Sequence, residues 1–211
     1  MTAPDNSIAH LVAATAVVRL QDFSTSAWHG KPAPDFALPS NEFLGLVLEL
    51  HRANFELWHI EDQARAPGAS DRQIAETKRA VDRTNQRRND LAEQCDALLL
   101  CRLEPHRLPA AEAELHSESP GLMLDRLSIL ALKIYHTREE MERANAPHGH
   151  AERNRERLAL LESQRGDLAG CLDALWGKVI AGERRFKIYR QLKMYNDPSL
   201  NPAVYLSQKT T

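Results

Sequence analysis

The stretch "HRANFELWHIEDQAR", residues 51–65, carries side chains that can do chemistry within an otherwise helical pattern. At about 100° per residue, five of them fall on one edge of a helix: His51, Asn54, Trp58, Asp62 and Arg65. Tryptophan, histidine and asparagine gain little on a solvated face and suit a partly dry cleft. The pattern therefore predicts a ligand-binding edge, from which the helical geometry turns His59 and Glu61 away.

The apolar residues of the same segment form a separate stripe. They recur at steps of three and four: Phe43, Leu46, Val47, Leu50, Ala53, Leu57, Ile60 and Ala64. This spacing is typical of the core-facing side of an amphipathic helix. Because the stripe is complete without any polar residue, the polar edge is available to face a neighbouring helix. A single histidine such as His51 is also compatible with a purely structural role.

A second polar line is predicted within residues 72–103. Beside an apolar stripe, this segment places chiefly carboxylates and amides at helical spacing: Lys78, Asp82, Gln86 (with Asn85), Asn89, Glu93 and Asp96. So many acceptors indicate either the opposite wall of the site or a solvated face whose acids pair with nearby arginines. The sequence leaves both interpretations open.

A third group lies in the apolar segment "LMLDRLSILALKIY", where Asp125, Arg126 and Ser128 stand among leucines and isoleucines. Buried charges need partners, so we expect Asp125 and Arg126 to be at least half buried and to pair with segments 41–66 and 72–103. A structural ion pair at Asp125 is the alternative. Asp125 and His136 lie about 16 Å apart along a helix, which excludes a catalytic triad of Asp125, Ser128 and His136.

Capping and breaking residues divide the chain into helices at about residues 5–22, 41–66, 72–103, 120–144 and 150–181, followed by a short basic helix at about 183–195. The expected N-caps are Ser40 or Asn41, Asp71, and Ser119 with Pro120 behind it, and Gly182 is the expected stop of the fifth helix. No segment alternates as a strand does. We predict an all-α antiparallel bundle, one domain over residues 1–211, with a Pro-rich loop before residue 40 and a tail within 183–211.

Composition limits the possible functions. The 211 residues carry a net charge of −2, with 43% hydrophobic and 27% charged residues, so no global charge favours nucleic acid or an anionic membrane. Cys95, Cys101 and Cys171 have no metal-like spacing, which predicts buried thiols in a reducing compartment. The run "IAHLVAATAVVRL" lacks signal-peptide features, and no stretch reaches the roughly 18 apolar residues of a membrane span. We expect a cytoplasmic protein.

The segment from Glu183 to Lys193 is basic, with five cations against one acid. Its interleaved Phe186 and Tyr189 would suit phosphates and bases, but one short segment in a chain of negative net charge argues against nucleic acid. A basic helix covering the bundle is the simpler interpretation. In it, arginines such as Arg190 meet the carboxylates of segment 72–103 or a bound phosphate.

Four blocks carry a resemblance to a known family: "LHRANFELWHIEDQAR", "IAETKRAVDRTNQRRNDLAEQCD", "SESPGLMLDRLSILALKIYH" and "YRQLKMYNDPSLNP". In this order they resemble the bacterial domain-of-unknown-function family DUF4254, from about Gln21 and Trp28-His29 to Pro202. The family pattern falls on these positions of the chain: Asn54, Trp58, His59, Glu61, Asp62, Arg65, Asp82, Asn85, Gln86, Arg88, Asn89, Asp90, Glu93, Asp96, Pro120, Gly121, Asp125, Arg126, Lys133, Tyr189, Arg190, Lys193, Tyr195, Asn196 and Asp197. One departure is "HSESPG", where the family has asparagine and threonine in place of His116 and Ser119, and serine preserves the cap. Family members near glycosyltransferase and polysaccharide genes imply a role in cell-surface glycan metabolism.

Three functions are compatible with these patterns. The first is a site for a phosphorylated or nucleotide-linked sugar, with Trp58 stacking on a ring and Arg65, Arg126 and Arg190 holding phosphate. The second is a metal-dependent phosphohydrolase of nucleotides, because Glu93 and Asp96 fit the ExxD half of the motif of all-α nucleoside-triphosphate pyrophosphatases, which bind Mg²⁺ or Mn²⁺. The upstream half of that motif is missing. The third is a non-enzymatic helical accessory protein with a glycosyltransferase partner, so the sequence does not decide whether the chain is an enzyme.

Overall fold

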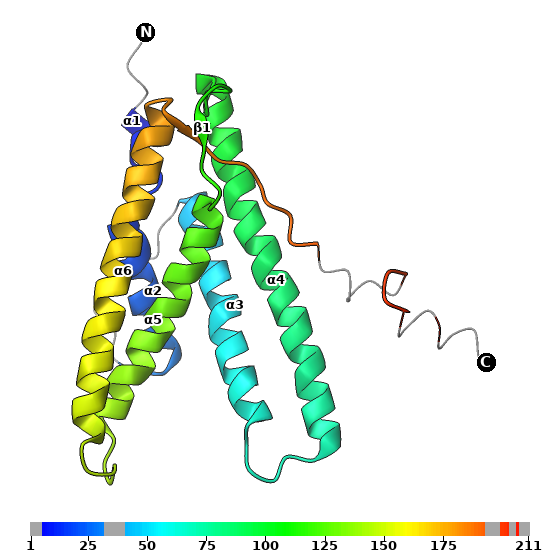
Figure 1. The fold of residues 1–211 in the computed structure, drawn as a ribbon, viewed down its shortest axis with the longest axis vertical. Helices are drawn as coiled ribbons and strands as arrows, with labels where there is room; N and C mark the ends of the chain where they lie inside the picture. Colours follow the sequence, from blue (N-terminus) through cyan, green and yellow to red (C-terminus); the bar gives the residue numbers. More distant parts are fainter. Residues whose placement is uncertain (1–5, 32–40, 193–198, 203–205, 207–211) are drawn as a thin grey trace.

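The computed structural model describes residues 6–31, 41–192, 199–202 and 206 (Figure 1). Five long helices dominate it: α2 (Ala14–Trp28), α3 (Glu42–Ala64), α4 (Asp71–Leu103), α5 (Pro120–Glu142) and α6 (His150–Ile180). One helical turn, α1 (Asn6–Ala9), precedes them, and a 3₁₀ turn, η1 (Glu104–His106), follows α4. From α3 to α6, consecutive helices run in opposite directions, whereas α2 runs parallel to α3 (Figure 1). The predicted all-α bundle is therefore confirmed, and its helices alternate in direction from α3 onwards.

The helices pack as two hairpins with α2 beside them. α3 packs against α4, α5 packs against α6, and α2 contacts α3, α5 and α6. The core between them is apolar and includes the fully buried Phe43, Leu50, Leu99, Leu127 and Leu172. α5 contacts both helices of the first hairpin, so side chains from α3, α4 and α5 can meet at one place.

Local capping fixes where the helices begin. The Asn41 side chain accepts a hydrogen bond from the Phe43 amide at 2.8 Å, and the Ser119 hydroxyl caps α5 ahead of Pro120, as predicted. The cap of α4 is Ser70 and not Asp71, because Ser70 and Gln73 form a reciprocal capping box. Asp71 is instead the first residue of the helix, where its negative charge interacts favourably with the positive end of the helix dipole.

The basic segment after α6 is not the predicted helix. Gly182, with a φ of +75°, ends α6 in the left-handed conformation as expected. Strand β2 (Arg184–Arg185) then pairs in parallel with β1 (Glu114–Leu115), and the His116 amide donates to the Arg185 carbonyl at 2.8 Å. From Phe186 to residue 192 no helix forms. The backbone groups of this segment thus bond to a distant part of the chain, which helical periodicity could not reveal, and the rest of the predicted helix lies outside the described residues.

Two further predictions are wrong. The N-terminal helix expected at 5–22 is α1 followed by α2, which continues to Trp28. Only Cys95 is a buried thiol, whereas Cys101 and Cys171 are exposed, because each lies on the outer side of its long helix. None of the described helices is both long enough and apolar enough to cross a membrane.

Candidate functional site

A cleft of about 430 Å³ opens beside the polar edge of α3. Asn54, Trp58, Asp62 and Arg65 line it together with Glu61. Of the side chains predicted for this edge, all but His51 therefore share one cavity. The opposite walls are Arg88 of α4 and the apolar Ile129 and Leu132 of α5, with Leu57 completing the lining. This amphipathic surface is typical of a small-molecule site.

Asn54, Asp125 and Arg88 form a polar network at the base of the cleft. The Asn54 amide donates to the Asp125 carboxylate at 2.8 Å, and Arg88 Nε lies 3.6 Å from the same oxygen. Burial raises the pKa of Asp125, while Arg88 and the Asn54 hydrogen bond oppose this shift. Asp125 thus takes partners from α3 and α4, as predicted, and holds the three helices in register.

Arg88 is the partly buried cation of the cleft. Its side chain is 24% exposed, and its Nε is buried with no hydrogen-bond partner. Its only polar contact within the described part of the chain is Asp125, at a distance too long for a hydrogen bond. A half-buried guanidinium without acceptors favours a ligand that brings them.

His51 does not line the cleft. It is fully buried, stacks on Trp28 and bonds to Thr25 through Nε2 at 2.8 Å and to Ser128 through Nδ1 at 2.7 Å. Because the Thr25 hydroxyl donates to the Gln21 carbonyl, it accepts from His51 Nε2, and Nδ1 accepts from Ser128. Burial lowers the pKa of His51 to about 3. His51 is therefore a neutral structural histidine and not a ligand-binding one.

The polar line of α4 is only partly related to the cleft. Asp82 pairs with Lys78 on the surface, and Gln86 donates to Asp90 at 2.8 Å beside a different hollow. Asn89 is half-buried and does not line the cleft. Most of this line therefore lies outside the cleft, and Asp82 pairs with Lys78, whereas the solvated-face interpretation expected arginine partners.

The two predicted metal ligands of α4 have other partners. Glu93 accepts from Arg190 at 3.3 Å and from the Gln191 amide at 2.8 Å, which ties the C-terminal segment to α4. Asp96 is buried and accepts from the Gly121 amide at 2.7 Å. Burial raises the pKa of Asp96 to about 6. These contacts assign Asp96 to the junction of α4 and α5.

The arginines predicted to hold phosphate do not gather. Arg126 is 58% exposed and pairs with Glu118 at 2.6 Å, so the expectation of a half-buried partner for α3 and α4 is wrong. It follows Asp125 by one residue and therefore points to a different side of α5. Arg190 is 70% exposed and lies on Glu93. Of the three, only Arg65 reaches the cleft, where it pairs with Glu61 at 2.9 Å.

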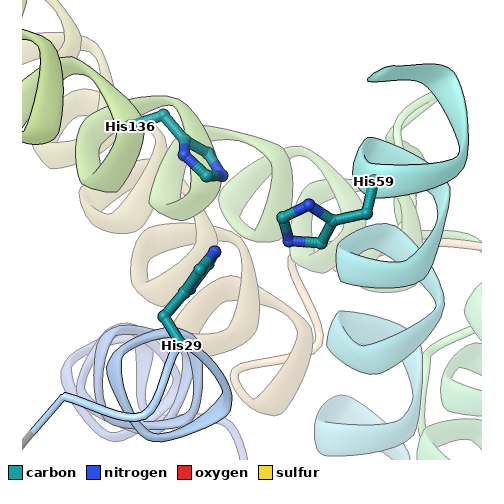
Figure 2. A group of neighbouring side chains, drawn as sticks. All are labelled: His29, His59 and His136. Carbon is teal, nitrogen blue, oxygen red and sulfur yellow. The ribbon is translucent and has the colours of Figure 1, made fainter. Parts of the chain in front are cut away.

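A cluster of three histidines lies next to the cleft. His29 at the end of α2, His59 of α3 and His136 of α5 each offer a ring nitrogen, and these atoms all lie within 4.8 Å of one another. Figure 2 shows the three rings converging on one point from three helices. We call this group the histidine cluster.

Hydrogen bonds fix two of these rings. Nδ1 of His29 donates to the Thr25 carbonyl at 2.8 Å, and Nδ1 of His136 donates to the Glu139 carboxylate at 2.9 Å. The Nε2 atoms of both rings are buried without a hydrogen-bond partner. Burial lowers the pKa of His59 and of His136, which favours neutral rings. The cluster could therefore hold a metal ion.

The sequence interpretation missed this cluster and the role of Arg88. It set His59 aside and considered His136 only for a triad. One signal was present: each histidine directly follows an aromatic residue, as Trp28-His29, Trp58-His59 and Tyr135-His136. Arg88 was visible as a cation interrupting the apolar stripe of residues 72–103. Neither signal reveals which helices meet.

Comparison with known proteins places the chain in a family. No curated protein and no solved structure matches it. The model of the family described as "Protein of unknown function (DUF4254)" matches residues 44–188, more than half of the chain, and this range includes the cleft, Arg88, His59 and His136. The chain therefore belongs to the DUF4254 family.

Proposed function

We propose that this protein binds a phosphorylated or nucleotide-linked sugar in the cleft between α3, α4 and α5. The observation that carries the proposal is Arg88, which lines the cleft and whose guanidinium donates no hydrogen bond to any described residue. Its Nε is buried beside Asp125, whereas its terminal nitrogens have no acceptor among the described residues and are open to one that a ligand supplies. Phosphate oxygens are charged acceptors that arginine binds strongly and often in a bidentate manner.

The remaining lining suits the sugar part of such a ligand. Trp58 gives an apolar wall, and Leu57, Ile129 and Leu132 extend it. The exposed Asp62 offers a carboxylate beside that wall, and Asn54, whose side-chain nitrogen donates to Leu50 and Asp125, has its amide oxygen left to accept. Hydroxyl groups both donate and accept, so a carboxylate and an amide next to an aromatic ring can bind a sugar.

The charges of the cleft determine where an anionic group fits. Glu61 and Asp62 repel a phosphate, whereas Arg65 and Arg88 attract it. Arg65 is 69% exposed and pairs with Glu61 on its own helix, a contact that contributes little and is easily exchanged. We therefore expect the phosphate between Arg65 and Arg88, with the sugar towards Asp62.

Binding is favoured over a metal-dependent phosphohydrolase at Glu93 and Asp96. Glu93 accepts a hydrogen bond from the C-terminal segment, and Asp96 accepts one from the start of α5. Both contacts belong to the fold, and neither carboxylate lines the cleft. A role beside a glycosyltransferase is compatible with binding, because an accessory protein can also hold the sugar donor.

Thermal unfolding with a ligand panel tests the proposal. The panel contains nucleotide sugars, the matching nucleoside diphosphates, sugar phosphates and free sugars, each with and without magnesium. We expect a rise in Tm with at least one phosphorylated sugar, no requirement for magnesium, and loss of the rise in Arg88→Gln. Stabilisation that requires magnesium supports the phosphohydrolase, and silence across the panel contradicts the proposal.

Arg87→Gln is the matched control. Arg87 neighbours Arg88 in sequence, but it pairs with Glu56 on the surface and lines a different hollow. Both variants lose one positive charge from the same turn of α4. A response lost in Arg88→Gln and kept in Arg87→Gln therefore reports the cleft and not the overall charge.

A further inference from the structure

We propose that His29, His59 and His136 bind a divalent first-row transition-metal ion through their imidazole nitrogens. The three residues come from α2, α3 and α5, and their ligand atoms all lie within 4.8 Å of one another. Figure 2 shows all three rings directed at one shared space. This site is separate from the sugar cleft, and the proposal does not depend on the function of that cleft.

The geometry is close to that of a bound metal. Zinc binds histidine nitrogen at about 2.0–2.1 Å, so two ligand atoms in a tetrahedral site lie about 3.3 Å apart. The widest pair of the cluster, at no more than 4.8 Å, would have to close by at most about 1.5 Å. Rotation of the rings about their side-chain torsions would have to supply this closure.

The hydrogen bonds of two rings leave the required lone pairs free. A carbonyl or carboxylate oxygen can only accept, so the proton of His29 and of His136 resides on Nδ1. Nε2 of each ring is then an unprotonated acceptor, and both are buried without a partner. Such an unsatisfied pair of acceptors is costly in an empty site and is explained by a cation between them.

The surroundings support metal binding in a second way. Histidines that bind metal usually donate their other N–H to a carbonyl or carboxylate, which orients the ring and raises its basicity. His29 does so to Thr25 and His136 does so to Glu139. The other oxygen of Glu139 pairs with Lys31 at 3.2 Å, so this carboxylate is itself held in place.

The donor atoms select the class of metal. Three imidazole nitrogens suit zinc, copper, nickel, cobalt or iron, whereas magnesium, calcium and manganese prefer oxygen ligands. Within the described residues no fourth side chain joins the group. A site with three protein ligands leaves a coordination position for water or a further ligand. We take Zn²⁺ as the probe and Co²⁺ as its spectroscopic substitute.

The experiment uses the full chain without an affinity tag, stripped of metal by a chelator. Cys101 and Cys171 are exposed thiols that could bind zinc on their own, so every variant carries Cys101→Ser and Cys171→Ser. Calorimetric titration with Zn²⁺ and the visible bands of Co²⁺ report binding, and circular dichroism of the metal-free protein reports folding. We expect one equivalent of Zn²⁺, a rise in Tm and a cobalt spectrum of nitrogen ligation.

Two ligand variants and one control separate the site from adventitious binding. His29→Gln and His59→Gln should lower the affinity by more than the roughly 10–100-fold that loss of an outer hydrogen-bond partner costs. His148→Gln should bind as the parent does, because His148 is exposed and outside the cluster. No stoichiometric binding by the parent, or unchanged affinity in folded His29→Gln and His59→Gln, would overturn the proposal.

Discussion

The ring of Trp58 stacks on that of His136, with centroids 4.8 Å apart and planes 9° from parallel. Trp58 also lines the cleft. One residue of α3 thus separates the proposed sugar site from the histidine cluster. His136 covers one face of the Trp58 ring, so a ligand in the cleft can contact only the edge or the opposite face of this ring.

Trp58→Leu should weaken both sites. It removes the stacking partner of His136, worth about 0.5–1.5 kcal/mol, and the aromatic wall of the cleft. We expect a lower affinity for Zn²⁺ and a smaller ligand-induced rise in Tm, each measured on the same preparation. Trp58→Phe keeps an aromatic ring at this position and should retain most of the Zn²⁺ affinity and most of the ligand-induced rise in Tm. Full retention of both responses in Trp58→Leu would show that the ring has no part in either site.

Asp125→Asn should destabilise the protein by about 1–3 kcal/mol. The carboxylate side chain is 15% exposed and is the only polar contact of Arg88 within the described residues. The variant leaves that guanidinium half-buried without a counter-charge. Urea unfolding measures the change. The control is Asp82→Asn, which breaks an exposed pair with Lys78 and should cost less than about 1 kcal/mol. Equal effects would mean that the network at the base of the cleft carries no special stability.

Most of the correct predictions concern features that are local in sequence, and the partners of Asp125 on α3 and α4 are an exception. The cap at Asn41, the stop at Gly182 and the polar edge of α3 each depend on residues within a few turns of one another. The histidine cluster depends on which helices meet, and the spacing within any one helix does not contain that information. The same reason explains why the prediction that Arg126 is half-buried is wrong. Its neighbour Asp125 faces α3 and α4, and one residue further along the helix the side chain reaches solvent.

The C-terminal segment shows the same limit. Its arginines and aromatic residues fit an amphipathic helix, yet Arg184 and Arg185 pair with Glu114 and Leu115, about seventy positions earlier. A two-residue parallel pairing has no periodic signature in the sequence. The contact of Arg190 with Glu93 is what remains of the prediction that this segment meets the acidic line of α4.

Stability should fall on the acid side because of His51. Its pKa is about 3 in the folded protein against 6.5 ordinarily, so the unfolded state binds a proton that the folded state excludes. The contribution of this residue is therefore complete above pH 6.5 and is lost as the pH falls towards 3. His51→Gln should be less stable than the parent at neutral pH and show a flatter decline below it. Urea unfolding at a series of pH values gives the free energy of unfolding of both proteins. If it falls in parallel for the two as the pH is lowered, His51 is not the cause.

Asp96 should lower the stability of the protein as the pH rises, which is opposite to the effect of His51. Burial raises its pKa from 3.8 to about 6, so the folded state prefers the protonated acid. Its contribution is complete below pH 3.8 and is lost as the pH rises through about 6, by about 3 kcal/mol in total. Asp96→Asn keeps an acceptor for the Gly121 amide and should remove this dependence. The exposed Asp90→Asn should leave it unchanged, and an identical pH profile for Asp96→Asn would exclude Asp96 as the source.

Gly121→Ala should be among the most destabilising single changes in the bundle. A Cβ at this position would lie 2.2 Å from the Ala92 carbonyl oxygen and 3.0 Å from the Asp96 side chain. The first contact is with helix backbone, so α5 would have to move away from α4, and the hydrogen bond from the Gly121 amide to Asp96 would be strained. Overpacking of this kind costs about 1–3 kcal/mol or more.

Gly170→Ala is the matched control for this change. Gly170 lies within α6, and a Cβ there meets nothing within 4 Å. The same substitution should therefore stabilise the protein by up to about 1 kcal/mol, because alanine favours the helix over glycine. Urea unfolding of both variants measures the change in the free energy of unfolding, which should be negative for Gly121→Ala and positive for Gly170→Ala. A Gly121→Ala protein as stable as Gly170→Ala would mean that α4 and α5 are not in close contact at the start of α5.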